Sequence, residues 1–396
     1  MGALDGVTVL DLSIIVQGPQ AAAMLHDLGA EVVKVELPGV GDLARWIHLA
    51  DDDPRSGFFE ACNRGKRSVT LDLRTPGGRE ACLRLAARSD VLVANFVPGT
   101  LERWGLSYEE VAAVNSGIVY ATGSTFGPVG PMAQREGADT SGQASGGLIA
   151  GTGLDGSEPT PVGAVIADVT GSQNMVVGIL AALLHRDRNG GRGQRIDVSL
   201  LGGQIWAQAS EYTAHLLTGR PQQRSNRGHP MIRGVLRQFA TADGHLVLVG
   251  VPGSLWPGFA RALGRPELAD DERFNTLFLT PENLAALFGI LEEIFATRTS
   301  DEWDERLTAE GQRHAIVRTH EQVAADPHTW ENGYLAEGDH PQWGRIKVVG
   351  CPIRFSATPA EPGIAAPELG QHTEEVLLEL GYSWDEIGQL REVGAC

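Results

Sequence analysis

Hydrophobic residues in the first half of the chain fall into short, nearly continuous runs that are separated by longer amphipathic stretches. Residues 7–12 and 31–36 form two β-rich runs, and the helix-forming stretch 20–28 lies between them. Gly29 follows this stretch at the position where a left-handed backbone is favoured. A strand, a helix and a strand within about thirty residues predict a βαβ unit, with parallel pairing and a right-handed crossover.

The same alternation continues beyond the first unit. The next elements are strands at 68–73, 90–94 and 117–122 and a helix at 77–88. Ser107 and Glu110 have the spacing of a capping box, which opens a further helix. Near-continuous apolar strands that alternate with helices predict an α/β fold with a doubly wound, Rossmann-like parallel sheet.

The regular alternation of strands and helices ends at about residue 200. The basic, polar segment 220–227 is typical of a linker, and it precedes a strand at 245–251 and helices at 281–297 and 300–309. Strand character returns at 345–349, and an amphipathic helix at 374–380 closes the pattern. We therefore predict four parts: a large domain over 1–200, a linker over 201–226, a small α+β domain over 227–325 and a C-terminal return to the large domain over 326–396.

Composition narrows the classes of protein to consider. The net charge of −18 disfavours binding to nucleic acid or to an anionic membrane, because both need a basic surface. The four cysteines lie far apart without a CxxC pair, which argues against a metal site or a disulfide framework and agrees with a reducing compartment. The apolar run 175–184 is too short to span a bilayer, and the first residues lack a signal-peptide pattern. We expect a cytoplasmic protein that contains no metal and does not bind a membrane.

Basic and aromatic residues follow several of the predicted strands. In open parallel sheets, ligands bind at the carboxyl ends of the strands. Four cations are available there for phosphate groups, and Phe96 and the apolar strand ends are available for a flat ring; the cations are Lys66, Arg67, Arg74 and Arg103. Taken singly, each of these cations is more often a solvated surface residue than a ligand. The first strand runs into Val16-Gln17-Gly18-Pro19, which is neither GxGxxG nor GxxxxGK[ST], so this turn has no dinucleotide fingerprint and no P-loop.

A lone acid ends the apolar stretch 161–167. Small residues follow Asp168, and an apolar helix is expected to begin near Gln173. Spacing alone favours a structural acid that compensates the helix dipole. The same position would also keep the carboxylate ionised, and an ionised carboxylate beside small residues can attack a thioester. Gly163 and Gly171 would then let an acyl chain approach the backbone.

A series of ordered motifs decides between these two interpretations. They are Val9-Leu10-Asp11-Leu12 with Gly18-Pro19, the stretch 28–36 with Pro38-Gly39-Val40-Gly41-Asp42, Asn63-Arg64-Gly65-Lys66-Arg67-Ser68, Asn95-Phe96 with Pro98-Gly99, Ala167-Asp168 with Gly171, His185-Arg186, Gly191-Arg192-Gly193-Gln194 and Leu369-Gly370-Gln371-His372-Thr373. In this order and spacing the chain resembles, nearly end to end, the class III CoA-transferases. This is the CaiB/BaiF group, which includes formyl-CoA and carnitine CoA-transferases.

The resemblance implies a site and an assembly. It implies an interlocked, ring-like homodimer in which coenzyme A, bound as the acyl-CoA co-substrate, lies on the large domain and Asp168 is the catalytic residue. The residues that it places at coenzyme A are Val16, Gln17, Leu71, Asp72, Leu73, Arg74, Asn95, Phe96, Val97, Arg103, Gly137, Ala138, Asp139 and Thr140. The small domain of one chain would lie near the site of the other.

Three positions differ from the patterns of related enzymes. Formyl-CoA transferases have an arginine at the position of Leu37, and their glycine-rich small-domain loop is reduced here to Gly250-Val251-Pro252-Gly253. Both differences argue against formyl-CoA and oxalate as the substrates. The related α-methylacyl-CoA racemases have a histidine at the position of Ala138. Because alanine cannot carry a proton, this difference favours transfer over racemisation.

The resemblance implies transfer of CoA from a donor thioester to a carboxylic or dicarboxylic acid. Asp168 would form a mixed anhydride and then an aspartyl-CoA thioester, with succinyl-CoA or acetyl-CoA as the donor. Three alternatives stand beside this hypothesis. They are an α-methylacyl-CoA racemase or isomerase, a noncatalytic subunit of a heteromeric CoA-transferase, and a dinucleotide-dependent dehydrogenase, which fits the fold class alone.

Overall fold

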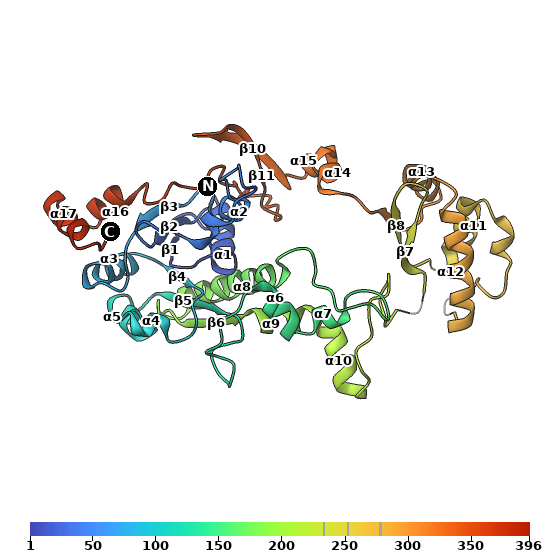
Figure 1. Cartoon of the computed structure of the whole chain (residues 1–396), viewed down its shortest axis with the longest axis horizontal. Coiled ribbons are helices and arrows are strands. Elements are labelled where there is room, and N and C mark those ends of the chain that lie inside the picture. The colour runs from blue at the N-terminus through green and yellow to red at the C-terminus, as the bar shows by residue number, and fades with distance from the viewer. Residues whose placement is uncertain (233, 252, 277–278) are drawn as a thin grey trace. The chain divides into compact units, whose positions relative to one another are not determined.

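The alternating strands build a six-stranded, fully parallel sheet in the computed structural model of the chain (Figure 1). The structure describes residues 1–232, 234–251, 253–276 and 279–396. The strands are β1 Thr8–Asp11, β2 Glu31–Glu36, β3 Arg67–Thr70, β4 Val91–Ala94, β5 Val119–Ser124 and β6 Arg195–Ser199. Their order is β3-β2-β1-β4-β5-β6, so the chain reverses its direction of winding between β1 and β4. The carboxyl ends of these two strands are the expected binding crevice of a doubly wound fold.

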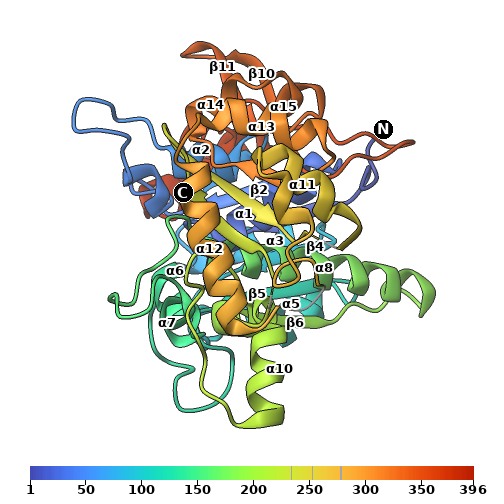
Figure 2. The same ribbon diagram turned by 90° about the vertical axis from the view of Figure 1, so that its right-hand side faces the viewer.

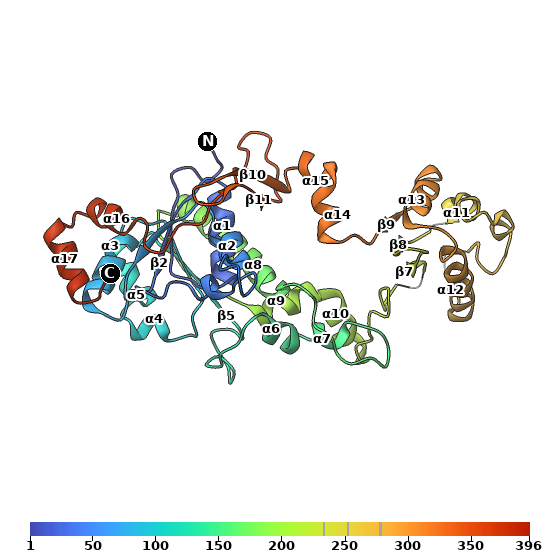
Figure 3. The same ribbon diagram turned by 45° about the horizontal axis from the view of Figure 1, so that its top comes forward.

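Helices cover both faces of this sheet, as Figure 3 shows. Successive strand residues point to opposite faces, so Val9 packs with α1 and α8, whereas Leu10 packs with α3, α5 and α16. The helices of the first face are α1 Gln17–Asp27 and α8 Ile166–Arg188. Those of the second face are α3 Pro76–Ala86, α4 Thr100–Arg103, α5 Tyr108–Val114, α16 Thr373–Glu379 and α17 Trp384–Glu392. The sheet is therefore the middle layer of a three-layer unit.

The remaining short elements of the first unit are η1 Leu43–Trp46, α2 Gly57–Asn63, α6 Asp139–Ser145, α9 Leu200–Ala207, α15 Pro327–Glu331, and the hairpin of β10 Leu335–His340 and β11 Gly344–Val349. Two further short helices, α7 Leu148–Gly151 and α10 Ala209–Thr218, extend into the second unit. The structure divides the chain into a first unit of residues 1–148, 161–213 and 327–396 and a second unit of residues 149–160 and 214–326. Within residues 201–226, predicted to be a linker, the chain instead forms most of α9 and all of α10, because apolar residues recur there at helical spacing.

The second unit has its own sheet and core. Figure 2 turns its helices α11, α12 and α13 toward the viewer. Its three-stranded antiparallel sheet is built from β7 Leu236–Ala240, β8 His245–Val249 and β9 His314–Ile316. Its helices are η2 Gly253–Leu255, α11 Trp256–Leu263, η3 Pro266–Ala269, α12 Pro281–Phe295, α13 Ser300–Ala309 and α14 His320–Ala325. Phe239, Phe259 and Trp303 are fully buried in this core. Pro252, part of the shortened glycine loop noted in the sequence, lies outside the described residues.

Helix α8 is longer than its apolar centre suggested. It begins at Ile166 rather than near Gln173, which places Asp168 inside its first turn. Among the described helices it is the one that is long and apolar enough to cross a membrane by length and composition, and 44% of that stretch is buried within the chain. A core helix of a soluble protein meets the same test, so this helix is weak evidence for a membrane span.

Two buried lysines and two buried aspartates lie beneath the loop that joins β1 to α1. The Lys66 ammonium is 2.7 Å from Asp11 Oδ2, and the Lys34 ammonium is 2.8 Å from Asp42 Oδ2; all four side chains are fully buried. Burial alone would raise the pKa of the Asp11 carboxyl, but the two lysines hold it below its usual value. The prediction that Lys66 binds phosphate is therefore wrong, because its charge is already neutralised inside the protein.

Candidate active site

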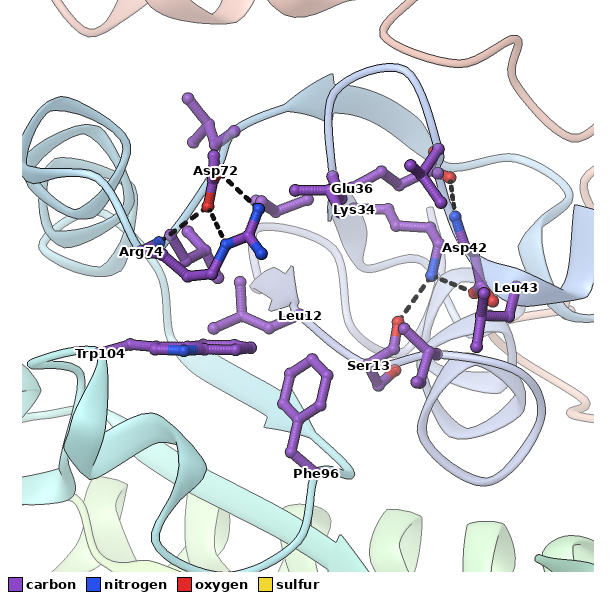
Figure 4. A pocket seen from close by; sticks show the side chains of 17 residues that line it. Leu12, Ser13, Lys34, Glu36, Asp42, Leu43, Asp72, Arg74, Phe96 and Trp104 are labelled. Atoms are coloured by element: carbon purple, nitrogen blue, oxygen red, sulfur yellow. Dashed lines mark hydrogen bonds and ion pairs between the residues drawn. The ribbon is translucent and has the colours of Figure 1, made fainter. Parts of the chain in front are cut away.

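A pocket of about 270 Å³ opens at the carboxyl ends of β1, β2 and β3, on the side where the winding reverses (Figure 4). Its walls are mainly apolar, and the lining residues are Leu12, Ser13, Ile14, Lys34, Val35, Glu36, Leu37, Val40, Gly41, Asp42, Leu43, Leu71, Asp72, Leu73, Arg74, Phe96 and Trp104. Phe96 and Trp104 meet edge to face, with ring centroids 5.0 Å apart. An apolar cleft with an aromatic wall suits a flat heterocycle.

The charged groups of this pocket differ in their availability. Lys34 donates to the carbonyl oxygen of Ser13 at 2.8 Å and is paired with Asp42. Arg74 is largely exposed and binds Asp72 through two N–H groups, at 2.8 and 2.7 Å. Since a guanidinium has five N–H groups, the other three remain free for an anion. Arg74 is therefore the lining cation that fits the predicted role of a phosphate ligand.

Two other predicted cations have different surroundings. Arg67 pairs with Glu31, Glu375 and Glu379 and does not line the pocket. Arg103 donates to Thr100 at 2.8 Å and does not line the pocket, although the neighbouring Trp104 does. The structure thus separates one candidate, Arg74, from the three other cations that follow the predicted strands.

The loop between β1 and α1 connects this pocket to a second polar centre. Asn95 donates to the Ile14 carbonyl and accepts from the Ile14 N–H, both at 2.8 Å, so its amide holds the loop. Ile15 has φ +68°, a left-handed conformation that is rare for a β-branched residue. Asp42 accepts from its N–H at 2.9 Å. Val16 is buried and caps α1 without a side-chain bond, and Gln17 follows as the first helical residue.

Gln17 has an amide group that is buried without a hydrogen-bond partner for its nitrogen. The amide lies between Gly123 at the end of β5 and Gly171 in α8: a Cβ on Gly171 would be 2.6 Å from Gln17 Nε2. Gly171 therefore makes room for this side chain, not for the acyl chain that we expected. An unpaired buried N–H is costly, and a carbonyl oxygen or oxyanion of a ligand would satisfy it.

Asp168 lies one helical turn before Gly171 and is 8% exposed. The Ser172 hydroxyl joins the two helices, since it lies 2.6 Å from the Gln17 carbonyl oxygen and 3.0 Å from that of Asp168. Burial, and then the charge of Asp139, raise the pKa of Asp168 to about 7. The expectation that the helix N-terminus keeps this carboxyl fully ionised is therefore wrong, because desolvation outweighs the dipole.

The other residues expected at coenzyme A have separate places. Val97 lines a small neighbouring hollow at the ends of β4 and β5. Gly137, Ala138 and Thr140 are exposed around the start of α6, whereas the carboxylate of Asp139 is buried and accepts from the backbone of α8. Within the described residues no cluster of His, Cys, Asp and Glu side chains is arranged to hold a metal ion.

Several pocket residues were not assigned from the sequence. They are Leu12 to Ile14, the stretch 34–37, the turn 40–43 and Trp104. The turn overlaps the motif Pro38-Gly39-Val40-Gly41-Asp42. Two glycines directly after a strand were therefore the sequence signal that could have placed this turn at the pocket. Trp104 gave no signal of its own, because an aromatic residue after a short helix is more often a core residue.

The fold is a doubly wound α/β unit with an apolar, aromatic-walled pocket at the switch point of its sheet. The model of CoA-transferase family III matches residues 4–373. The chain is 34% identical to the succinyl-CoA–D-citramalate CoA-transferase of Chloroflexus aurantiacus, over 98% of this chain and 96% of that one. It is 33% identical to the succinyl-CoA:glutarate CoA-transferase of Homo sapiens, over 99% and 89%.

A solved structure shows the same relationship. The crystal structure of a CaiB/BaiF family protein from Brucella suis matches with a TM-score of 0.84 and 34% identity, covering 96% of this chain and all of that one. The chain belongs to CoA-transferase family III, and it is a CoA-transferase. The predicted family and enzyme class are confirmed.

Proposed function

We propose that this CoA-transferase moves CoA from a donor thioester to an acceptor carboxylic acid through covalent intermediates on Asp168. The observation that carries the proposal is a nearly buried carboxyl in the first turn of α8, one turn before Gly171, against which the unpartnered amide of Gln17 packs. With a pKa of about 7, this carboxyl is partly ionised at neutral pH and is more basic than an ordinary aspartate. It is therefore a stronger nucleophile once ionised.

The proposed reaction has four steps. The Asp168 carboxylate attacks the donor thioester carbon, which forms a mixed anhydride and expels the CoA thiolate. The thiolate attacks the aspartyl carbonyl, which releases the donor acid and leaves an aspartyl-CoA thioester. The acceptor carboxylate attacks this thioester, which forms a second anhydride and again frees the thiolate. Attack of the thiolate on the acceptor carbonyl releases the new acyl-CoA and restores Asp168.

The groups around Asp168 support these steps. The Gln17 N–H can bond the oxyanion that develops on the attacked carbonyl, where an unpaired donor in a dry site is most effective. The loop from Ser13 to Gln17 leads from the pocket to this amide, so a ligand seated against Phe96 and Trp104 lies beside the chain segment that ends at Gln17. We place the adenine ring of CoA in that pocket and a phosphate group at Arg74.

Succinyl-CoA is the donor that we propose, with a dicarboxylic acid as acceptor. The support is that several relatives are named as transferases of succinyl-CoA with citramalate, glutarate or mesaconate. The purified chain, incubated with succinyl-CoA and a panel of mono- and dicarboxylic acids, should yield the CoA thioester of at least one dicarboxylate by mass spectrometry. Hydrolysis alone with every acid would contradict the proposed reaction, and activity of the chain by itself would exclude the role of a noncatalytic subunit.

Replacing Arg74 with alanine is expected to raise the KM for succinyl-CoA by about tenfold with little change in kcat. The reason is the loss of a charge-assisted bond to phosphate, and such bonds contribute about 1.5–3 kcal/mol. Steady-state kinetics at saturating acceptor measure the effect. Arg84→Ala is the matched control, since Arg84 pairs with Glu80 on the outer surface of α3. An equal rise in KM for the two variants would place the phosphate elsewhere.

Two copies of the chain are proposed to assemble through α8 and α9, which pack together and carry exposed apolar side chains. Val177, Leu184 and Trp206 are 66%, 51% and 74% exposed. Trp206→Asp is expected to convert a dimer to a monomer in sedimentation-velocity runs, because a charge would have to be buried at the interface. Trp384→Asp, at a similarly exposed tryptophan on α17, should leave the dimer unchanged. A wild-type monomer at micromolar concentration would refute the assembly.

We also propose that the protein acts in the cytoplasm, on water-soluble substrates and away from membranes. All four cysteines have free thiols, and Cys62 and Cys82 are buried. Free thiols are typical of a reducing compartment.

A further inference from the structure

Asp139 and Gln143 lie one turn apart on α6, and both side chains are buried against the segment that carries Asp168. Asp139 Oδ1 accepts from the backbone N–H groups of Ala167, at 2.7 Å, and of Asp168, at 3.2 Å. Asp139 Oδ2 accepts from the Gln143 amide at 2.6 Å. Both carboxylate oxygens are therefore engaged within the protein.

This carboxylate replaces the missing cap of α8. Val165, at the cap position, makes no side-chain bond to the helix. The first N–H groups of a helix need acceptors, and Asp139 supplies them from another element. Gln143 extends the connection, because its amide accepts from the Val162 N–H at 3.0 Å and donates to the Ala164 carbonyl at 3.2 Å. The first turn of α8 and the loop before it are thus held to α6.

The same contact places a second carboxylate near Asp168. Two like charges in a desolvated site oppose each other's ionisation. The other side chains around this turn do not compensate. Gln17 of α1 and Gln204 of α9 are neutral amides, and burial raises the pKa of the Cys62 thiol on α2 to about 11, which keeps it neutral. Asp139 is therefore the charged side chain that acts on Asp168 from the elements packed around this turn.

We propose that Asp139 is a positioning residue for the transfer reaction: it orients the first turn of α8 and, by its charge, sets the pH range in which Asp168 reacts. The inference rests on the proposed role of Asp168 as the nucleophile. It assigns Asp139 a different role from the contact with coenzyme A that the resemblance implied. Acylation of Asp168 removes one of the two facing charges, so the repulsion in the free enzyme is relieved when the anhydride forms.

The pH dependence of acylation tests this role. The wild-type rate of acyl-enzyme formation from succinyl-CoA, trapped with hydroxylamine and quantified by mass spectrometry, should fall about tenfold per pH unit below pH 7, because only the ionised carboxyl attacks. Asp139→Asn keeps an oxygen for the two N–H groups and removes the charge. The acidic limb of the pH–rate profile of this variant should therefore move to lower pH. At pH 6 the variant should retain a several-fold larger fraction of its plateau rate than wild type does.

A purely structural role predicts something different. It would lower the plateau rate of Asp139→Asn at every pH and leave the limb in place, and that result would overturn the inference. Glu136→Gln, which neutralises an exposed acid three residues earlier, should keep the wild-type limb. The titration of succinyl-CoA itself is common to all proteins and cancels in the comparison.

Two further measurements keep the test decisive. If Asp139→Asn fails to fold, the double variant Asp139→Asn with Gln143→Glu lets the Asn amide donate to the Glu carboxylate and moves the charge from position 139 to position 143; the acidic limb of its pH–rate profile should also lie at lower pH. Asp168→Asn must give no trapped product. Trapped product or full activity in that variant would refute the proposed function itself. If Asp168→Asn is inactive but the acidic limb of the Asp139 variants stays at the wild-type pH, only the role of Asp139 is refuted.

Discussion

Asp168→Asn is expected to lower CoA transfer by about a thousandfold or more, because an amide cannot form the anhydride on which all later steps depend. The substitution keeps the size of the side chain, and the helix cap comes from Asp139 rather than from Asp168, so folding should be preserved. Steady-state transfer from succinyl-CoA measures the loss, and circular dichroism and thermal melting verify the fold.

The loss should be specific to this carboxyl. Asp187→Asn, at the opposite end of the same helix, changes an exposed acid whose partner is the neighbouring Arg186, and it should retain wild-type activity. In wild type, hydroxylamine should convert the acylated aspartate to a hydroxamate in the peptide that contains residue 168. A hydroxamate on another residue, or substantial transfer by Asp168→Asn, would show that a different group is the nucleophile.

Lys66→Met is expected to destabilise the protein by about 3–5 kcal/mol, since it leaves a buried charge without its partner. The Lys66 ammonium donates to Asp11, to the Pro19 carbonyl and to Asn63, all within 2.9 Å and all buried. Asp11 would then depend on Lys34, whose ammonium is 3.9 Å away. The free energy of unfolding, from urea titration, measures the effect.

The neighbouring residue provides the control. Arg67→Met breaks three ion pairs, yet the Glu partners are more than half exposed, so the expected loss is about 1 kcal/mol or less. Adding Asp11→Asn to Lys66→Met should restore part of the stability by removing the unpaired charge. A cost for Lys66→Met no larger than that for Arg67→Met would mean that water or another cation neutralises Asp11.

Local patterns predicted elements of both units well. The strand at 31–36 coincides with β2, the helix at 300–309 coincides with α13, and the capping box of Ser107 and Glu110 is present. These elements depend on short-range features: apolar runs for buried parallel strands, and cap residues for helix ends. The start of α8 was misplaced by seven residues because its cap is not in the local sequence. It is Asp139, 29 residues before Asp168.

The candidate site was predictable in part. Motifs in order identified the family, and they selected residues 71–74 and Phe96, which do line the pocket. The strand pattern alone could not separate Arg74 from Lys66 and Arg67, because all three are basic residues close to the same strand; only the resemblance placed Arg74 at coenzyme A. Which cation is exposed, which is buried with an acid and which is paired on the surface depends on residues distant in the chain, such as Asp11 and Glu375.

The amino-acid sequence by itself determined the class of fold, the family and the identity of the lone acid that we assign to the chemistry. Periodicity and caps act over a few residues, so they can be recognised without coordinates. The tertiary structure decided what surrounds that acid. Burial and the carboxylate of Asp139 raise the pKa of Asp168 to about 7, and Gln17 brings an unpaired amide against Gly171, one turn further along α8. Desolvation and the distances between charges exist only once the chain is folded, and they set the reactivity of a carboxyl.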